Sequence, residues 1–259
     1  MIPYARKERY NIDDLIEIVR LLRSPDGCPW DKEQTHESIR SEFIEETYEV
    51  IEAIDRKEPA LLQEELGDVL LQVVFHSQIE REQKHFSFED VCTEICEKMI
   101  QRHPHVFDTV QADSTEQVLK NWDAIKEQSK HQTTRTQTLE SVAKTLPALM
   151  RAQKVYKRAS KAELEFLKEP VLLEQMQAHL TALKTAQERG DCAQVESILG
   201  ALLFCCTGIA QQSGISAEQA LTDRTEQFIA QFAAAEKKSL EAGCGMKEGW
   251  KETGIDAVG

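Results

Sequence analysis

The sequence is poor in the residues that build turn-rich β folds. Glycine (11) and proline (7) are scarce among its 259 residues, although the two usually make up about 12% of a protein. Aromatic residues are few, with 3 Trp, 4 Tyr and 9 Phe, whereas the good helix formers Leu, Ala, Glu, Gln and Lys supply most of the chain. The composition therefore predicts an all-α protein.

The chain also lacks long apolar runs and an excess of positive charge. No run approaches 18 apolar residues, and the N-terminal residues lack the apolar core of a signal peptide. The formal net charge of −14 repels phosphate backbones and anionic lipids at long range. We therefore expect a cytoplasmic protein that binds no nucleic acid and no membrane. A cation can still bridge a small anionic substrate to such a protein.

Cysteine is present without a disulfide or zinc pattern. The seven cysteines are odd in number and include no Cys-x-x-Cys pair, which disfavours a disulfide framework and a structural zinc site. Cys92 and Cys96 lie one helical turn apart, near His103 and His105. Because free cysteine behaves as a small apolar residue, we expect these two thiols to be reduced and buried.

Helix signals recur along the first half of the chain. Asn11, Pro59 and Ser87 are each suited to begin a helix, a further helix is expected from about Thr35 to Asp55, and Ser114-x-x-Gln117 resembles a capping box. The apolar residues expected to be buried on the two central helices are Ile39, Phe43, Ile44, Val50, Ile51, Ile54, Leu62, Leu66, Val69, Leu70, Val73 and Val74.

The best domain boundary is a polar, threonine-rich stretch. We assign residues 129–145 to a linker between a helical domain at 1–128 and a second one at 146–259. The second domain has helical patterns at 146–168, 170–188, 191–212 and 216–242, followed by a glycine-containing tail around Trp250.

One expected helix is unusually acidic. Residues 41–55 contain six acids and no lysine or arginine, so like charges three or four apart repel without the usual Glu–Lys pairs. Glu46 and Glu49 are three apart, and Glu65 and Asp68 repeat that spacing on the next helix. If Lys57 is the midpoint of the turn, Glu49 meets Glu65 and Glu46 meets Asp68 at the same heights along an antiparallel hairpin.

Four carboxylates at that spacing suit a hard cation. Magnesium prefers oxygen ligands and accepts substrate phosphate oxygens beside its carboxylates. The alternative is a solvated acidic face without a ligand. A di-iron bundle is disfavoured, because the Glu-x-x-His elements at Glu33–His36 and Glu82–His85 fall at helix margins.

The pattern resembles a known family. Glu45-Glu46-x-x-Glu49 followed by Glu65-x-x-Asp68 resembles the EExxE and ExxD motifs of the all-α MazG family of nucleoside triphosphate pyrophosphohydrolases. The segments that extend the resemblance over nearly the whole chain are CPWDKEQTHESIR (28–40), EELGDVLLQVVFH (64–76), EKMIQRHPHVF (97–107) and LPALMRAQKVYKRA (146–159). The resemblance implies two helical repeats of four-helix-bundle type and a homodimer.

The resemblance implies hydrolysis of a nucleoside triphosphate to the monophosphate and pyrophosphate by water attack at the α-phosphorus. The cofactor would be Mg²⁺, with Mn²⁺ as an alternative ion, and its ligands would be Glu46, Glu49, Glu65 and Asp68. Glu45 is then the acid left to orient or deprotonate the water.

Positively charged and aromatic residues match the family's substrate contacts. Lys98 and Arg102 are four apart, so one helix face presents both to the phosphates; the alternative is a solvated pair near a helix end. Trp122 and Lys126 match the segment beside the nucleotide, although a buried tryptophan is the competing interpretation, and Trp30 and Lys32 lie in a loop able to cover the site.

The second half departs from the motifs. Ile198 and Ala201 stand where Glu65 and Asp68 align, the first motif is reduced to Glu174-Gln175-x-x-Ala178, and Gln227 and Gln231 replace the two basic residues. Our hypothesis is that this half keeps its fold, has lost catalysis and serves as a packing or dimerisation partner.

The sequence thus predicts a pyrophosphohydrolase that cleans the nucleotide pool. The rival hypothesis is a non-catalytic Mg²⁺-dependent nucleotide-binding regulator that acts through a protein partner. Residues 37–68 hold eleven acids against three basic residues, so much of the negative charge lies in the hairpin that would hold the metal.

Overall fold

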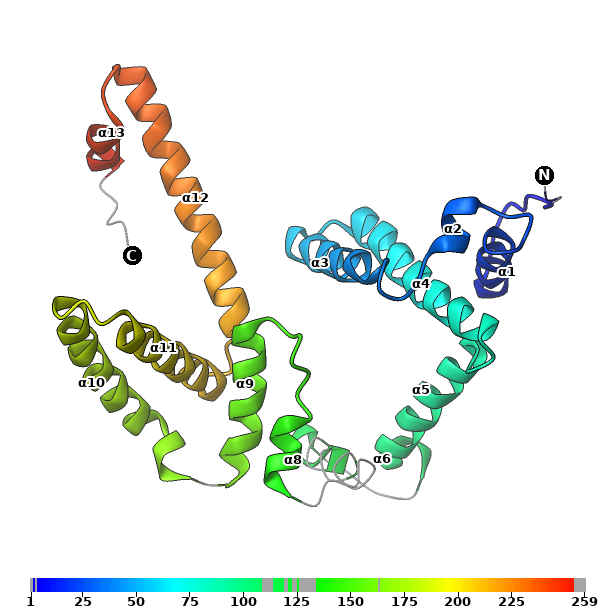
Figure 1. Ribbon diagram of the computed structural model, residues 1–259, viewed down its shortest axis with the longest axis horizontal. Coiled ribbons are helices and arrows are strands. Elements are labelled where there is room, and N and C mark those ends of the chain that lie inside the picture. The colour runs from blue at the N-terminus through cyan, green and yellow to red at the C-terminus, as the bar shows by residue number, and fades with distance from the viewer. Residues whose placement is uncertain are drawn as a thin grey trace. The chain divides into compact units, whose positions relative to one another are not determined.

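The computed structural model describes residues 2, 4–108, 114–118, 121–122, 125, 134–162 and 164–253. Within these ranges the chain forms helices and turns and no β-strand, so the all-α prediction is confirmed (Figure 1). The chain divides into two compact units, Met1–Ser129 and Lys130–Gly259, and each is described by itself below.

The first unit is a helical hairpin with shorter helices at both ends. Its described helices are α1 (Ile12–Leu22), α2 (Pro29–Glu33), α3 (Arg40–Arg56), α4 (Pro59–Glu82), α5 (Phe88–Arg102) and α6 (Pro104–Phe107). Asn11 and Ser87 each form a capping box at the start of α1 and α5, and Pro59 occupies the first turn of α4. Ser114 accepts a hydrogen bond from the Gln117 backbone N–H (3.3 Å), as expected of a capping box.

Helix α3 begins five residues later than the apolar pattern predicted. The reason is local hydrogen bonding: the backbone N–H of Thr35 donates to Ser38 Oγ (2.9 Å), and the Ser38 N–H donates to Thr35 Oγ1 (3.3 Å). These side chains satisfy backbone groups that a helix would otherwise use, which favours a turn before Arg40.

The turn between α3 and α4 sets the register of the hairpin. Lys57 adopts a left-handed conformation (φ 57°), and the backbone N–H groups of Lys57 and Glu58 donate to the last carbonyls of α3. This is the usual way in which a helix ends and reverses direction. Lys57 is thus the midpoint of the reversal, and α3 and α4 run side by side in opposite directions (Figure 1).

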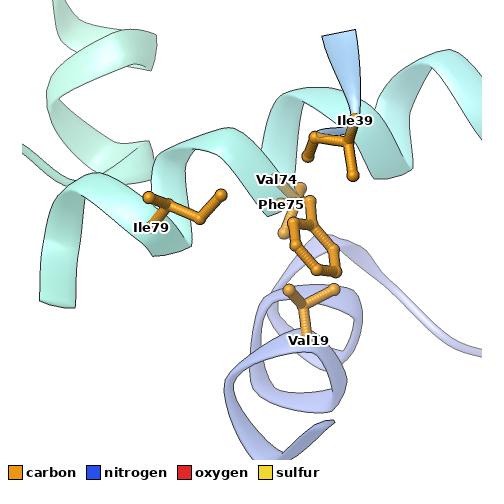
Figure 2. Packing of buried hydrophobic residues seen from close by; sticks show 5 residues of the cluster. All are labelled: Val19, Ile39, Val74, Phe75 and Ile79. Carbon is orange, nitrogen blue, oxygen red and sulfur yellow. The ribbon is translucent and has the colours of Figure 1, made fainter. Parts of the chain in front are cut away.

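The core of the first unit lies where α1 and the start of α3 meet α4. Phe75 on α4 points toward Val19 of α1, and Ile39 packs against the same cluster (Figure 2). The predicted burial of Ile39 and Val74 is confirmed, with 2% and 1% of each residue exposed.

Four predicted core residues are exposed instead. Ile44 and Ile54 on α3 are each 54% exposed, and Leu66 and Leu70 on α4 are 51% and 40% exposed. One hairpin buries only the facing stripe of each helix, so apolar residues beyond that stripe are left exposed in the described part of this unit. The burial expected for the two cysteines is also incomplete, because Cys92 is half-buried and Cys96 is exposed.

Polar contacts attach the segment before α3 to the far end of α4. The guanidinium of Arg23 donates to both carboxylate oxygens of Glu82 (2.9 and 2.8 Å) and to the carbonyls of Asp31 and Gln34 (2.6 and 3.1 Å). His36 hydrogen-bonds Glu80 through Nε2 (2.6 Å). These contacts hold the segment that contains α2, the helix that carries Trp30 and Lys32.

Glu80 gives this attachment a pH dependence. Hydrogen bonds from His36 and His85 lower the pKa of Glu80 below its usual value, which is about 4.3 for glutamate. A lowered pKa stabilises the fold above the pKa of the unfolded chain, and that stability is lost as the pH falls through the folded pKa. We predict that Glu80→Gln lowers Tm at pH 7, and that the gap to the unsubstituted protein closes below about pH 4. Thermal melts across this range test it, and a gap independent of pH would contradict the assignment.

The second unit repeats the long-hairpin arrangement. Its described elements are α8 (Arg135–Glu140), α9 (Ala148–Ala159), η1 (Ser160–Ala162), η2 (Glu165–Leu167), α10 (Glu169–Glu188), α11 (Cys192–Gln212), α12 (Ala217–Ala242) and α13 (Met246–Thr253). Helix α8 lies inside the stretch predicted as a linker, α9 ends before residue 168, and the tail around Trp250 is helical.

The hairpin of α10 and α11 packs around a compact core. Tyr156, Leu167, Leu172 and Cys205 are buried together. Gly208 leaves room for the Tyr156 ring, which a Cβ at position 208 would approach to 2.6 Å.

Helix α11 is long and apolar enough to cross a membrane, judged by its length and composition. One such helix is weak evidence for a membrane span, because the core helix of a soluble protein has the same properties.

Candidate metal centre

The hairpin brings acidic side chains from α3 and α4 together. One carboxylate oxygen each from Glu46, Glu49 and Glu65 lies within 4.8 Å of the other two. Asp68, the fourth expected ligand, is close enough for its charge to act on both Glu46 and Glu65. The antiparallel register thus places the two Glu-rich turns opposite each other.

The cluster is electrostatically unfavourable by itself. Burial raises the pKa of Glu46, and repulsion from Asp68 and Glu49 adds to that effect. Burial also raises the pKa of Glu65, with Glu49 as the largest charged contributor. Hydrogen bonding with Glu49 raises the pKa of both side chains further. Glu46 and Glu65 therefore retain protons more strongly than ordinary glutamates. A cation that binds to them would displace these protons.

The donor set fits a divalent cation. Magnesium binds oxygen at about 2.1 Å, so two of its ligands lie at most about 4.2 Å apart. Oxygens already within 4.8 Å of one another reach that separation with small side-chain rotations. Hard carboxylate oxygens without histidine or thiol ligands favour Mg²⁺ or Mn²⁺ over zinc.

Glu45 lies at the edge of this arrangement. It is exposed and precedes Glu46 on α3, so it projects about 100° around the helix from Glu46. It stands beside the cluster and is absent from the group of converging oxygens.

The two basic residues predicted to hold phosphates lie together on α5. Lys98 Nζ donates to Glu94 (3.0 Å), and the Arg102 guanidinium lies 5.0 Å from the centre of the Trp122 ring. Among the described residues neither forms an ion pair with the four carboxylates. Trp122 is half-buried, whereas Lys126 lies outside the residues that the structure describes.

Trp30 and Lys32, which were predicted to lie in a loop that covers the site, lie instead in the short helix α2, which begins at Pro29. Trp30 is 57% exposed, which leaves much of its ring accessible. Lys32 Nζ donates to the carbonyl of Pro25 (2.9 Å), in the turn that precedes α2.

Two residues of α4 escaped the sequence analysis. His76 stacks on His36 with ring centres 4.9 Å apart, and their Nδ1 atoms are 2.6 Å apart. Gln72, between Asp68 and His76, is buried among apolar neighbours in the sequence. Both lie in segment 64–76, which carries the family resemblance, and positions 68, 72 and 76 recur at the four-residue spacing of one helix face.

The corresponding positions of the second unit do not form such a cluster. Glu174 and Gln175 lie on α10, while Ile198 and Ala201 lie on α11, where Ile198 is buried. In the part of the chain that the structure describes, Glu46, Glu49 and Glu65 are the one group of three or more potential metal-binding side chains that converge.

Fold and site together define an all-α protein with a cluster of converging carboxylates on a helical hairpin. The model of the MazG nucleotide pyrophosphohydrolase domain matches residues 34–107, a range that contains all four carboxylates. The chain is 37% identical over 248 residues to the nucleoside triphosphate pyrophosphohydrolase of Escherichia coli strain K12, covering 95% of this chain and 92% of that one. It is 38% identical over 236 residues to the nucleoside triphosphate pyrophosphohydrolase/pyrophosphatase MazG of Thermotoga maritima, covering 91% and 89%. The chain belongs to the MazG family.

Proposed function

We propose that this chain hydrolyses nucleoside triphosphates to monophosphates and pyrophosphate, and that it removes unwanted nucleotides from the cellular pool. The observation that carries the proposal is the convergence of Glu46, Glu49 and Glu65 within 4.8 Å in a chain of the MazG family. The relatives from Escherichia coli and Thermotoga maritima bear this activity in their names.

The four carboxylates of the hairpin would hold Mg²⁺, or Mn²⁺ in its place. When bound, the ion supplies positive charge to the phosphates and to the developing negative charge of the reaction. Glu46 and Glu49 place ligands on α3, and Glu65 and Asp68 place ligands on α4. Because their positions follow from the hairpin register, the site is largely set before substrate binds.

The remaining side chains act on water and on the nucleotide. Glu45 orients the water and accepts its proton as the oxygen bonds to the α-phosphorus and the bond to the departing pyrophosphate breaks. Lys98 and Arg102 bind the phosphates. Trp122, Lys126, Trp30 and Lys32 contact the nucleoside or cover it.

Product analysis separates this function from the regulatory alternative. The full-length protein is incubated with each ribonucleoside and deoxyribonucleoside triphosphate and Mg²⁺, and the products are resolved by anion-exchange chromatography. Equal amounts of monophosphate and pyrophosphate are expected. Nucleotide binding without turnover would instead identify a non-catalytic regulator, and orthophosphate as the first product would place the attack at another phosphorus.

We also propose that residues 1–128 form the catalytic domain and that residues 146–259 form a degenerate repeat. Residues 129–145 would be the linker between them. In support of this proposal, Ile198 and Ala201 replace two acids of the cluster, and neither side chain can bind a cation. Its tail is packed by aromatic residues: Trp250 packs on Phe228 and Phe232, with ring centres 5.9 and 6.3 Å apart. This half therefore keeps its packing without the ligands.

We also propose that the protein is a homodimer, with the four-helix bundle completed by the second copy. Ile44 and Tyr48 on α3 and Leu66 and Leu70 on α4 are exposed. Each pair is four residues apart, and Tyr48 and Leu66 are the same distance from Lys57. The two residues of each helix therefore form an apolar patch on the side of that helix that turns away from the carboxylates, of the kind that a protein interface covers.

A charge placed in the apolar patch of Leu66 and Leu70 on α4 should dissociate the dimer. We predict that Leu66→Lys shifts the protein to the monomer in analytical ultracentrifugation, because burying an ammonium in an apolar interface is strongly unfavourable. Leu240→Lys, at a 77% exposed position on α12, is the matched control and should leave the assembly unchanged. A dimer that survives Leu66→Lys would place the interface elsewhere.

A cytoplasmic location without nucleic-acid or membrane partners completes the proposal. Nucleoside triphosphates are its proposed substrates, and the net charge of −14 repels polyanions.

A further inference from the structure

Gln72 carries a buried oxygen without a partner. The residue is 7% exposed, and its Oε1 is fully buried and accepts no hydrogen bond. Buried polar atoms are nearly always satisfied, so an exception calls for an explanation. Two other buried polar side chains of α4 do have partners: Ser77 donates to the Val73 carbonyl (2.8 Å), and Gln78 donates to Glu82 (3.0 Å).

Helical spacing puts Gln72 on the carboxylate face of α4. It lies four residues after Asp68 and seven after Glu65, the separations at which side chains share one stripe. One turn further on, His76 lies against Phe43 of α3, with ring centres 5.6 Å apart. Gln72 thus occupies the turn between the carboxylates and the contact with Phe43, where α4 faces α3.

The chemistry of the orphaned atom restricts its ligand. An amide oxygen is an acceptor, so it cannot bind a phosphate oxygen or a carboxylate, which are acceptors too. Its partner is an O–H or N–H donor, or a cation. Divalent cations such as Mg²⁺ usually keep several water molecules beside their carboxylate ligands, and those waters need acceptors for their protons.

We propose that Gln72 is a positioning residue whose side-chain oxygen accepts a hydrogen bond from a water molecule bound to the divalent cation. This inference rests on the proposed function, because it requires the four carboxylates to hold a cation. Gln72 would orient that water and so tighten cation binding without being a ligand itself.

Gln72→Met in the full-length chain tests the proposal, with Gln78→Met as the matched control. Mn²⁺ affinity is measured by titration calorimetry, and Tm is measured in EDTA. For Gln72→Met we expect Mn²⁺ affinity to fall about 10-fold, the scale seen when partners behind metal ligands are removed. Its Tm in EDTA should stay unchanged or rise, because the substitution removes an unsatisfied buried oxygen. The control loses the bond to Glu82, so its Tm should fall while its Mn²⁺ affinity stays unchanged.

Different results would contradict the proposed function and the proposed role of Gln72. If the unsubstituted protein binds no Mn²⁺ and releases no pyrophosphate, the proposed function itself is wrong and the inference falls with it. If that protein binds Mn²⁺ and hydrolyses nucleotides while Gln72→Met binds Mn²⁺ equally well, the inference alone is overturned. A lower Tm in EDTA for Gln72→Met, with unchanged affinity, would show a purely structural role.

Discussion

Replacing Glu49 with alanine is expected to abolish Mg²⁺-dependent pyrophosphate release. The Glu49 carboxylate converges with those of Glu46 and Glu65 within 4.8 Å, so its loss opens the centre of the proposed ligand set. Removing residues that only support metal ligands costs about 10–100-fold. Loss of a ligand should therefore lower kcat/KM by more than about 100-fold, measured as pyrophosphate release at fixed free Mg²⁺.

The control for this experiment comes from the second unit. Glu174 lies on α10 and is the one acid left in the segment of the second half that aligns with the first motif. Glu174→Ala therefore also removes a glutamate carboxylate from a helix, but in the unit proposed to be inactive. Its activity should equal that of the unsubstituted protein. Wild-type activity in Glu49→Ala would contradict the site, and loss of activity in Glu174→Ala would contradict the assignment of catalysis to the first unit.

Adding Mg²⁺ is expected to stabilise the protein against heat. Burial and neighbouring acids raise the pKa values of Glu46 and Glu65, so the cluster opposes folding when it is charged without a cation. At 100 times the dissociation constant, a ligand that binds only the folded state contributes about 2.7 kcal/mol. At about 4 °C per kcal/mol for a domain of this size, this corresponds to a rise in Tm of roughly 10 °C for the transition of the first unit, Met1–Ser129.

Glu65→Gln should raise Tm without Mg²⁺ and remove most of the increase in Tm that Mg²⁺ causes. With one buried negative charge fewer, the variant should melt above the unsubstituted protein in EDTA and gain little from Mg²⁺. Glu174→Gln should behave as the unsubstituted protein does. Equal Mg²⁺-induced shifts in the unsubstituted protein and in Glu65→Gln, measured by calorimetry, would show that the ion binds elsewhere.

Local chemistry explains why much of the fold was predictable. The capping boxes at Asn11 and Ser87 and the proline at position 59 act within a few residues of themselves, and the corresponding helices begin there. The convergence of Glu46, Glu49 and Glu65 was predictable for a similar reason. Helical rise and a reversal at Lys57 fix their heights without knowledge of distant packing.

Features that depend on distant partners were not predictable. Ile44 and Leu66 belong to apolar helix patterns, but whether they are buried depends on what covers the hairpin rather than on their own helix. The contact of His36 with His76 joins residues forty positions apart, and no local pattern indicates it. The missing partner of Gln72 became visible only once the side chains around α4 were placed.

The surroundings of one tryptophan in each unit support the proposal that the second unit is a repeat without the motifs. Around Trp122 in the first unit lies the guanidinium of Arg102 (5.0 Å), whereas Trp250 in the second packs on Phe228 and Phe232. A contact between a cation and an aromatic ring is replaced by aromatic packing, which stabilises a fold without binding phosphate. This difference supports a packing role for the second repeat.

Hydrolysis in ¹⁸O-labelled water tests the central claim most directly. The full-length protein is incubated with Mg²⁺ and a nucleoside triphosphate in H₂¹⁸O, and both products are analysed by mass spectrometry. Attack of water at the α-phosphorus predicts one ¹⁸O atom in the nucleoside monophosphate and none in the pyrophosphate. Label in the pyrophosphate, or release of orthophosphate in place of pyrophosphate, would contradict the account.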